Sequence, residues 1–254
     1  MFYFLLFVFG LAIGSFLNVA SMRYPKSTGG RSRCLYCHKI LSWRELIPLA
    51  SYLVQKGKCR NCGHRLSLQY PLVEVLTGGI FLFLGYHFQR LAVLPDFSVW
   101  QNYIPLLLWL IAAACFILIA LIDLRLFIIP DGLTIAIVII GVLMAALKTD
   151  YLNHALTAVL SLLAFGFVVF VTRGRGMGMG DVKLAGAIGL LLGFPSSLVA
   201  FAAAFIIGAV WGIGLILFGN KNLKDAVPFG PFLVLGVFFS LLLESLPIDL
   251  SSYL

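Results

Sequence analysis

Long apolar runs alternate with short polar connections along most of this chain. A run that spans a bilayer needs roughly 20 residues, and it must satisfy its own backbone hydrogen bonds, which favours α-helix. The expected fold is therefore an all-α polytopic membrane protein. About eight transmembrane helices are predicted, at 2–21, 71–88, 103–122, 132–148, 153–172, 182–194, 197–218 and 229–246.

One polar stretch divides this pattern. Residues 22–70 carry few long apolar runs and form a predicted insert between the first two helices. The expected organisation is a first transmembrane helix at 1–21, a cytoplasmic insert at 22–70 and a membrane bundle at 71–254. We find no internal repeat in the sequence, and its one glycine-rich tract is 174–180.

Composition supports the membrane assignment. Hydrophobic residues make up 61% of the chain and charged residues 11%, with a mean hydropathy of +1.05, whereas a soluble domain is usually about a quarter charged. The first run could be a cleavable signal peptide. It begins Met1-Phe2-Tyr3 without basic residues and is followed by Arg23, which instead indicates a retained helix with its N-terminus outside.

The basic residues predict a topology. Of the 18 Lys and Arg residues, only Arg90 and Lys148 fall on one side of the expected membrane. The positive-inside rule then places the insert in the cytoplasm and both termini outside. A basic cluster can also bind nucleic acid, but in a membrane protein it favours contact with anionic lipid. We therefore expect membrane lipid and no nucleic acid among the partners.

Four cysteines in the insert predict a metal site. Cys34 and Cys37 form one Cys-x-x-Cys pair, and Cys59 and Cys62 form a second. Two such pairs supply four thiolates for tetrahedral Zn²⁺, and a Cys₄ shell leaves no open position, which indicates a structural role. Two disulfides are the alternative, disfavoured by a reducing cytosol. A redox Cys-x-x-Cys would not need the second pair.

Three further residues near these motifs have simpler interpretations. His38 and His64 adjoin the cysteine pairs and are expected at the surface rather than as ligands. Cys115, in the middle of a predicted helix, is expected to serve packing.

Two carboxylates stand at membrane-helix ends and are candidates for chemistry. Asp123 follows the third apolar run, and Asp181 precedes the sixth; the topology places both at the cytoplasmic end of the bundle. Two carboxylates held close together share a proton, which is the basis of aspartyl protease chemistry. The alternative for each is a local ion pair, Asp123 with Arg125 and Asp181 with Lys183.

Other polar positions carry weaker signals. Gly178 and Gly180 would allow close backbone approach or a positive φ beside Asp181. Asp131, just before an apolar run, is predicted to be a helix N-cap. Glu74 could interact with the dipole of the second helix or meet a cationic substrate group. A face of Gly14, Ser15 and Asn18 predicts close helix packing, with Asn18 bonding across helices.

Several sequence blocks stand in order along the chain. They are Gly14–Val19 (GSFLNV), Arg23–Pro25 (RYP), the paired cysteines with Ser42-Trp43, Ile47-Pro48, Ser51–Leu53 (SYL) and Gly57–Cys59 (GKC), Tyr70–Glu74 (YPLVE), Leu76–Gly78 (LTG), Asp123–Asp131 (DLRLFIIPD), Gly178–Leu184 (GMGDVKL) and Pro228–Pro231 (PFGP). In this order they resemble the type IV prepilin peptidases, the leader peptidase/N-methyltransferases, which are GxGD-type intramembrane aspartyl proteases. The resemblance spans nearly the whole chain. It departs at Leu35, where the family often has proline, and at Met177 and Met179, where the family often has smaller residues.

The resemblance implies a function. Asp123 and Asp181 would be the catalytic pair, and Asp131 would not. The enzyme would lie in the bacterial cytoplasmic (inner) membrane and cleave type IV prepilins or type II secretion pseudopilins. Cleavage would follow the glycine that ends a basic leader, on the cytoplasmic face. The resemblance also implies N-methylation of the new N-terminus with S-adenosylmethionine. The sequence assigns no binding residues for S-adenosylmethionine.

Two other functions compete with this interpretation. Paired membrane acids can relay protons in a transporter, although transporters often show inverted repeats. A non-catalytic assembly factor with a zinc knuckle is the third possibility, and it would tolerate loss of both aspartates.

Overall fold

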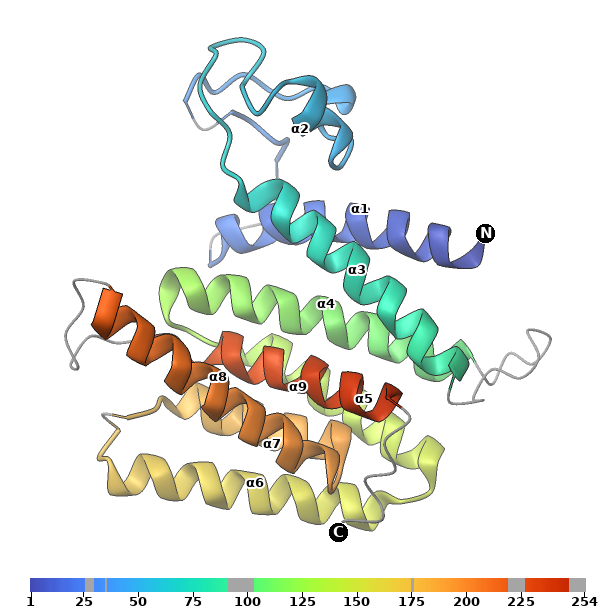
Figure 1. The fold of residues 1–254 in the computed structure, drawn as a ribbon, viewed down its shortest axis with the longest axis vertical. Coiled ribbons are helices and arrows are strands. Elements are labelled where there is room, and N and C mark those ends of the chain that lie inside the picture. The colour runs from blue at the N-terminus through green and yellow to red at the C-terminus, as the bar shows by residue number, and fades with distance from the viewer. Residues whose placement is uncertain (26–29, 35, 91–102, 175, 219–226, 247–254) are drawn as a thin grey trace. The chain divides into compact units, whose positions relative to one another are not determined.

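The computed structural model describes residues 1–25, 30–34, 36–90, 103–174, 176–218 and 227–246. The chain forms two compact units, Met1–Ala92 and Val93–Leu254, and each is described by itself (Figure 1). The first contains α1 (Phe2–Arg23), the 3₁₀ turn η1 (Trp43–Glu45), α2 (Ala50–Val54) and α3 (Gln69–Arg90). The second contains α4 (Tyr103–Leu126), α5 (Asp131–Lys148), α6 (Tyr151–Val171), α7 (Met179–Leu192), α8 (Ser196–Phe218) and α9 (Gly230–Ser245).

All eight predicted apolar segments are helices in the structure, with their ends moved by a few residues. The described part of the chain contains two isolated β-bridges and no strand, so the all-α fold class is confirmed. Five helices, α1, α3, α4, α6 and α8, are long and apolar enough to cross a membrane. Because α5 and α9 are shorter and α7 has 14 residues, the count of eight spans stays a prediction.

In the first unit α1 and α3 lie side by side (Figure 1). Small residues at their contact allow the two helices to come close. A Cβ atom added to Gly10 would lie 2.7 Å from the Cα of Gly78, and one on Gly14 would lie 2.9 Å from the Cα of Glu74. The buried Asn18 donates its Nδ2–H to the carbonyl of Tyr70 at 3.3 Å. The predicted close packing and the bond across helices are therefore confirmed.

The insert between these helices has almost no interior. Among its described residues, only Cys34 and Cys59 are buried. Neither η1 nor α2 buries a residue. A small module without an apolar core needs another source of stability, such as a bound metal ion or attachment to a larger structure.

In the second unit α7 is the central helix. It contacts α5, α6, α8 and α9, and most of its side chains are buried. A Cβ on Gly186 would lie 2.6 Å from the side chain of Leu162, and one on Gly189 would lie 2.6 Å from Ser161 Oγ. The glycines that lower helix propensity here thus permit close contact with α6, because no side chain keeps the two helices apart.

Helix α9 connects two sides of this unit, since it packs against both α4 and α8. Its Gly236 lies directly against the backbone of Ala200 in α8. The N-terminus of α9 comes close to the C-terminal end of α4, as the bond between Gly230 and Asp123 shows. The bond joins two helix ends that are distant in sequence.

We expect Gly10→Ala to destabilise the first unit, because the new methyl group meets the backbone of α3, which cannot move aside. Overpacking of this kind costs about 1–3 kcal/mol. Gly79→Ala, where the added Cβ has nothing within 4 Å, is the matched control and should keep stability or raise it by up to about 1 kcal/mol, because alanine has the higher helix propensity. Thermal unfolding of the purified protein in detergent measures both, and equal midpoints for the two variants would contradict the packing described.

Candidate functional site

The first candidate acid, Asp123, lies in the last turn of α4 and is 4% exposed. Its Oδ2 accepts a hydrogen bond from the backbone N–H of Gly230 at 2.9 Å. Gly230 begins α9, and Pro231 follows it in the first turn. The carboxylate is therefore held by the N-terminus of another helix, where unpaired N–H groups and the helix dipole favour negative charge.

The second acid, Asp181, is in the first turn of α7 and is 8% exposed. Its Oδ2 accepts a hydrogen bond from the backbone N–H of Gly178, the N-cap residue, at 3.0 Å. This is the carboxylate half of a capping box, so the position of Asp181 is set within its own helix.

The structure brings the two carboxylates near each other. The charge of Asp123 acts on Asp181, although the two residues belong to different helices. Lys183, the predicted local partner of Asp181, instead donates from Nζ to Asp131 Oδ1 at 2.8 Å. A negative charge on one carboxylate therefore disfavours a negative charge on the other.

The glycines around Asp181 act through their size. Neither Gly178 nor Gly180 has a positive φ, so the predicted left-handed backbone is not adopted at either glycine. A Cβ on Gly180 would lie 3.1 Å from the Cβ of Ile129, in the connection between α4 and α5. Close approach is therefore the use of Gly180 here, because it brings the chain that follows Asp123 against the start of α7.

The prediction that Asp131 is an N-cap was wrong. Helix α5 begins at Asp131 itself, and the N-cap position belongs to Pro130, with φ −67°. From the first helical position the Asp131 carboxylate reaches Lys183 of α7, and both side chains are more than half exposed. Asp131 thus bridges two helices next to the acid pair, outside the buried site.

The predicted interaction of Glu74 with the helix dipole was also wrong, and its contact with a cationic substrate group stays a prediction. Helix α3 begins at Gln69, so Glu74 lies beyond the first turn. It is 6% exposed, and its Oε2 accepts the backbone N–H of Leu49 at 2.8 Å. Glu74 therefore fastens the insert, at the residue that precedes α2, to the side of a membrane helix.

The four insert cysteines form one cluster. Their sulfur atoms all lie within 4.8 Å of one another, with Cys34 and Cys62 separated by 3.9 Å and Cys37 and Cys59 by 4.0 Å. An ideal zinc tetrahedron with Zn–S bonds of about 2.3 Å has sulfurs about 3.8 Å apart, whereas a disulfide requires about 2.05 Å. The cluster has the geometry of a metal site, and the disulfide alternative is not adopted.

The two halves of the cluster repeat each other. Cys34 N–H donates to Lys39 O at 3.0 Å, as Cys59 N–H does to His64 O at 2.9 Å. A short β-bridge flanks each pair, Arg33 with Ile40 and Lys58 with Arg65. This local repeat places two thiols of each loop toward the same point.

The thiols differ in their ease of ionisation. The backbone N–H of Lys39 and then the Asn61 side chain lower the pKa of Cys37 to about 6. At Cys62 the backbone N–H of His64 favours the thiolate, but desolvation and the neighbouring thiols outweigh it and raise the pKa to about 11. A bound cation at this cluster would compensate the charge of four thiolates.

The other residues singled out near the cysteines lie as expected. His38 and His64 are exposed, and the His64 ring stacks on Tyr36 with centroids 3.2 Å apart. Cys115 is half-buried within α4. None of these three belongs to the metal cluster.

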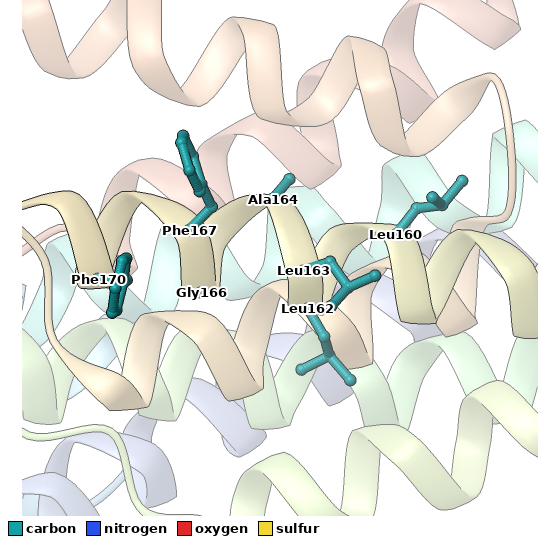
Figure 2. Close-up of a pocket in the computed structure, with 7 residues that line it drawn as sticks. All are labelled: Leu160, Leu162, Leu163, Ala164, Gly166, Phe167 and Phe170. Atoms are coloured by element: carbon teal, nitrogen blue, oxygen red, sulfur yellow. The ribbon is translucent and has the colours of Figure 1, made fainter.

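An apolar groove of about 670 Å³ runs along α6. Figure 2 shows that its labelled side chains all come from this one helix. They are all apolar: Leu160, Leu162, Leu163, Ala164, Gly166, Phe167 and Phe170. The groove offers no acid, base or nucleophile, so it suits lipid or an apolar helix and not a catalytic step.

Two models of known protein families match most of the chain. Residues 8–88 match the bacterial peptidase A24 N-terminal domain, and residues 110–213 match the type IV leader peptidase family. The first range includes the four insert cysteines, and the second includes both candidate aspartates. No solved structure matches the chain significantly.

Three curated relatives align with this chain over nearly the full length of both proteins. A prepilin leader peptidase/N-methyltransferase of Bacillus subtilis is 33% identical, over 91% of this chain and 90% of the relative. One from Aeromonas salmonicida is 32% identical, over 94% and 89%. A type 4 prepilin-like proteins leader peptide-processing enzyme of Escherichia coli O78:H11 is 34% identical, over 93% and 92%.

Proposed function

This chain belongs to the type IV leader peptidase family, and on that premise we propose that it is a membrane aspartyl endopeptidase with Asp123 and Asp181 as its catalytic pair. One observation carries the proposal: two buried carboxylates from different helices lie within electrostatic range. Each is oriented by a glycine N–H at a helix N-terminus.

The proposed reaction is peptide hydrolysis. One carboxylate takes a proton from water while the water oxygen attacks the scissile carbonyl carbon, and the protonated carboxyl donates its proton to the carbonyl oxygen. When the tetrahedral intermediate collapses, the first carboxyl donates the proton it took from water to the nitrogen. The second carboxylate takes back a hydroxyl proton, and the C–N bond breaks to release the amine. Each carboxylate has one oxygen bonded to a glycine N–H, which leaves its second oxygen for water and substrate.

The proposed substrates are prepilins and type II secretion pseudopilins, which the relatives' names and the resemblance suggest. Cleavage would follow the glycine ending the basic leader, on the cytoplasmic face of the inner membrane, with both termini of the enzyme outside. By the same reasoning the enzyme would methylate the new N-terminus with S-adenosylmethionine, whose binding residues we do not assign.

We propose that residues 22–70 form a cytoplasmic insert stabilised by zinc, between a first helix at 1–21 and a membrane bundle at 71–254. Cys34, Cys37, Cys59 and Cys62 would hold the ion, since their sulfur spacing fits a tetrahedral Cys₄ site. Four thiolates fill its coordination shell, so the ion would supply stability to the insert and no chemistry to the reaction.

Membrane lipid is the proposed partner of the insert surface. The hydrogen bond between Glu74 and Leu49 holds the start of α2 beside the second turn of α3, a candidate membrane span. Leu53 and Val54 of α2 are 73% and 69% exposed. At the level of the membrane interface such side chains are covered by lipid, and the basic residues of the insert would meet anionic headgroups.

We expect Asp123→Asn and Asp181→Asn each to abolish cleavage of a prepilin-like peptide, because an amide cannot take a proton from water. The double variant should be no worse than either single one, since the two groups act as a unit. Asp131→Asn is the control and should retain most activity, because an exposed ion pair contributes only about 0–1 kcal/mol. Normal cleavage by Asp181→Asn would refute the aspartyl mechanism, whereas no cleavage by the wild-type protein would favour a transporter or an assembly factor.

Purified protein should contain about one equivalent of Zn²⁺. Cys→Ser at position 34, 37, 59 or 62 should lower the metal content and make the insert sensitive to protease, because it has no apolar core to hold it. Cys115→Ser should keep its metal. Elemental analysis without zinc, combined with disulfides in protein isolated under reducing conditions, would exclude this site.

The proposed topology is tested by labelling engineered cysteines in intact cells. A membrane-impermeant thiol reagent should reach Asp150→Cys, between α5 and α6, from outside. It should reach Arg173→Cys, after α6, only once the membrane is permeabilised. Both positions are exposed in the structure, so the reverse pattern would place the acid pair on the face opposite to a cytoplasmic leader.

A further inference from the structure

We propose that Gly230 is a positioning residue for the catalytic pair: its N–H orients the Asp123 carboxylate, and its missing side chain leaves the space that this carboxylate occupies. The inference rests on the proposed function, because it gives Gly230 a role only if Asp123 reacts. Neither the acid pair nor the glycines beside Asp181 depend on Gly230 for their identification.

The steric part of the proposal comes from the surroundings of Gly230. A Cβ added there would lie 2.7 Å from Asp123 Oδ2, 3.2 Å from its Cγ and 3.4 Å from its Cβ. All three nearest atoms thus belong to the one carboxylate side chain. Any residue larger than glycine therefore displaces Asp123 or moves the end of α9.

The hydrogen-bonding part comes from the start of α9. The bond from Gly230 N–H to Asp123 Oδ2 is buried and joins residues 107 positions apart. Pro231 has no N–H, so the neighbouring position offers no competing donor. Phe229, the residue before Gly230, packs on Phe205 of α8 with ring centroids 5.1 Å apart, which is a second contact of this helix end.

The two acids differ in how they are held. Asp181 is bonded to Gly178 within the same helix end, so its orientation survives small movements between helices. Asp123 is bonded to a separate helix, so its orientation depends on the placement of α9 against α4. Gly230 is the residue at which that placement is set.

The test uses the full-length purified enzyme and a prepilin-like peptide. Gly230→Ala should lower kcat by about 100-fold, as expected for a displacement of about 1 Å, with KM within about threefold. Gly212→Ala in α8, where an added Cβ has nothing within 4 Å, should match the wild type. Wild-type kcat for Gly230→Ala, while Asp123→Asn is inactive, would overturn this inference alone. Activity in Asp123→Asn would overturn the proposed function instead.

A second measurement separates positioning from general packing. We expect Gly230→Ala to lower the thermal midpoint in the wild-type background and to have little effect in Asp123→Ala, because the carboxylate it meets is gone. This interaction between neighbouring sites is what a double-mutant cycle measures. If Gly230→Ala alone does not fold, folding of the Asp123→Ala/Gly230→Ala protein supports the proposal. An equal loss of stability in both backgrounds, or failure of both proteins to fold, would overturn it.

Discussion

Burying two carboxylates near each other is the constraint on which the second unit depends. An isolated charge in an apolar environment is strongly unfavourable unless it is hydrogen-bonded, and here each carboxylate accepts a backbone N–H from the start of a helix. Backbone donors at helix N-termini are unpaired in any case, so the bundle needs no buried side-chain cation to hold them. The acids consequently lie where helices end.

Small residues make this arrangement possible, because the three helix ends must come close together. Gly180 lets the connection after α4 approach the start of α7, and Gly230 lets the start of α9 approach Asp123. Farther along α7, Gly186 and Gly189 admit α6. Between membrane helices, packing of this kind replaces the hydrophobic effect, because lipid tails are as apolar as the side chains they would leave. Stability of the bundle and geometry of the acid pair therefore have the same origin.

Most of the fold could be predicted from hydropathy alone, since a membrane helix satisfies its backbone within one segment. The cysteine cluster followed from spacing, because two short pairs of thiols have few other uses in a reducing compartment. Asp131 and Glu74 were misjudged for one reason: both were interpreted through their own helices, whereas their partners, Lys183 and the Leu49 N–H, belong to other segments. The role of Gly230 was not predicted, because its contact with Asp123 joins segments that are distant in sequence. The proline that follows it, at the start of an apolar run, does signal a helix N-terminus.

The insert and the bundle are stabilised by different physics. The bundle contains its own packed interior, while the insert buries only two cysteine side chains among its described residues. A module so poor in buried area needs further support, which the proposed metal ion and attachment to a larger structure would give. Glu74 provides that attachment from a buried position in α3, beside Gly14 of α1. The same two helices that pack through glycines therefore also carry the anchor of the insert. The acid pair belongs to the second unit, so the contacts that hold the insert and those that hold the acids are separate.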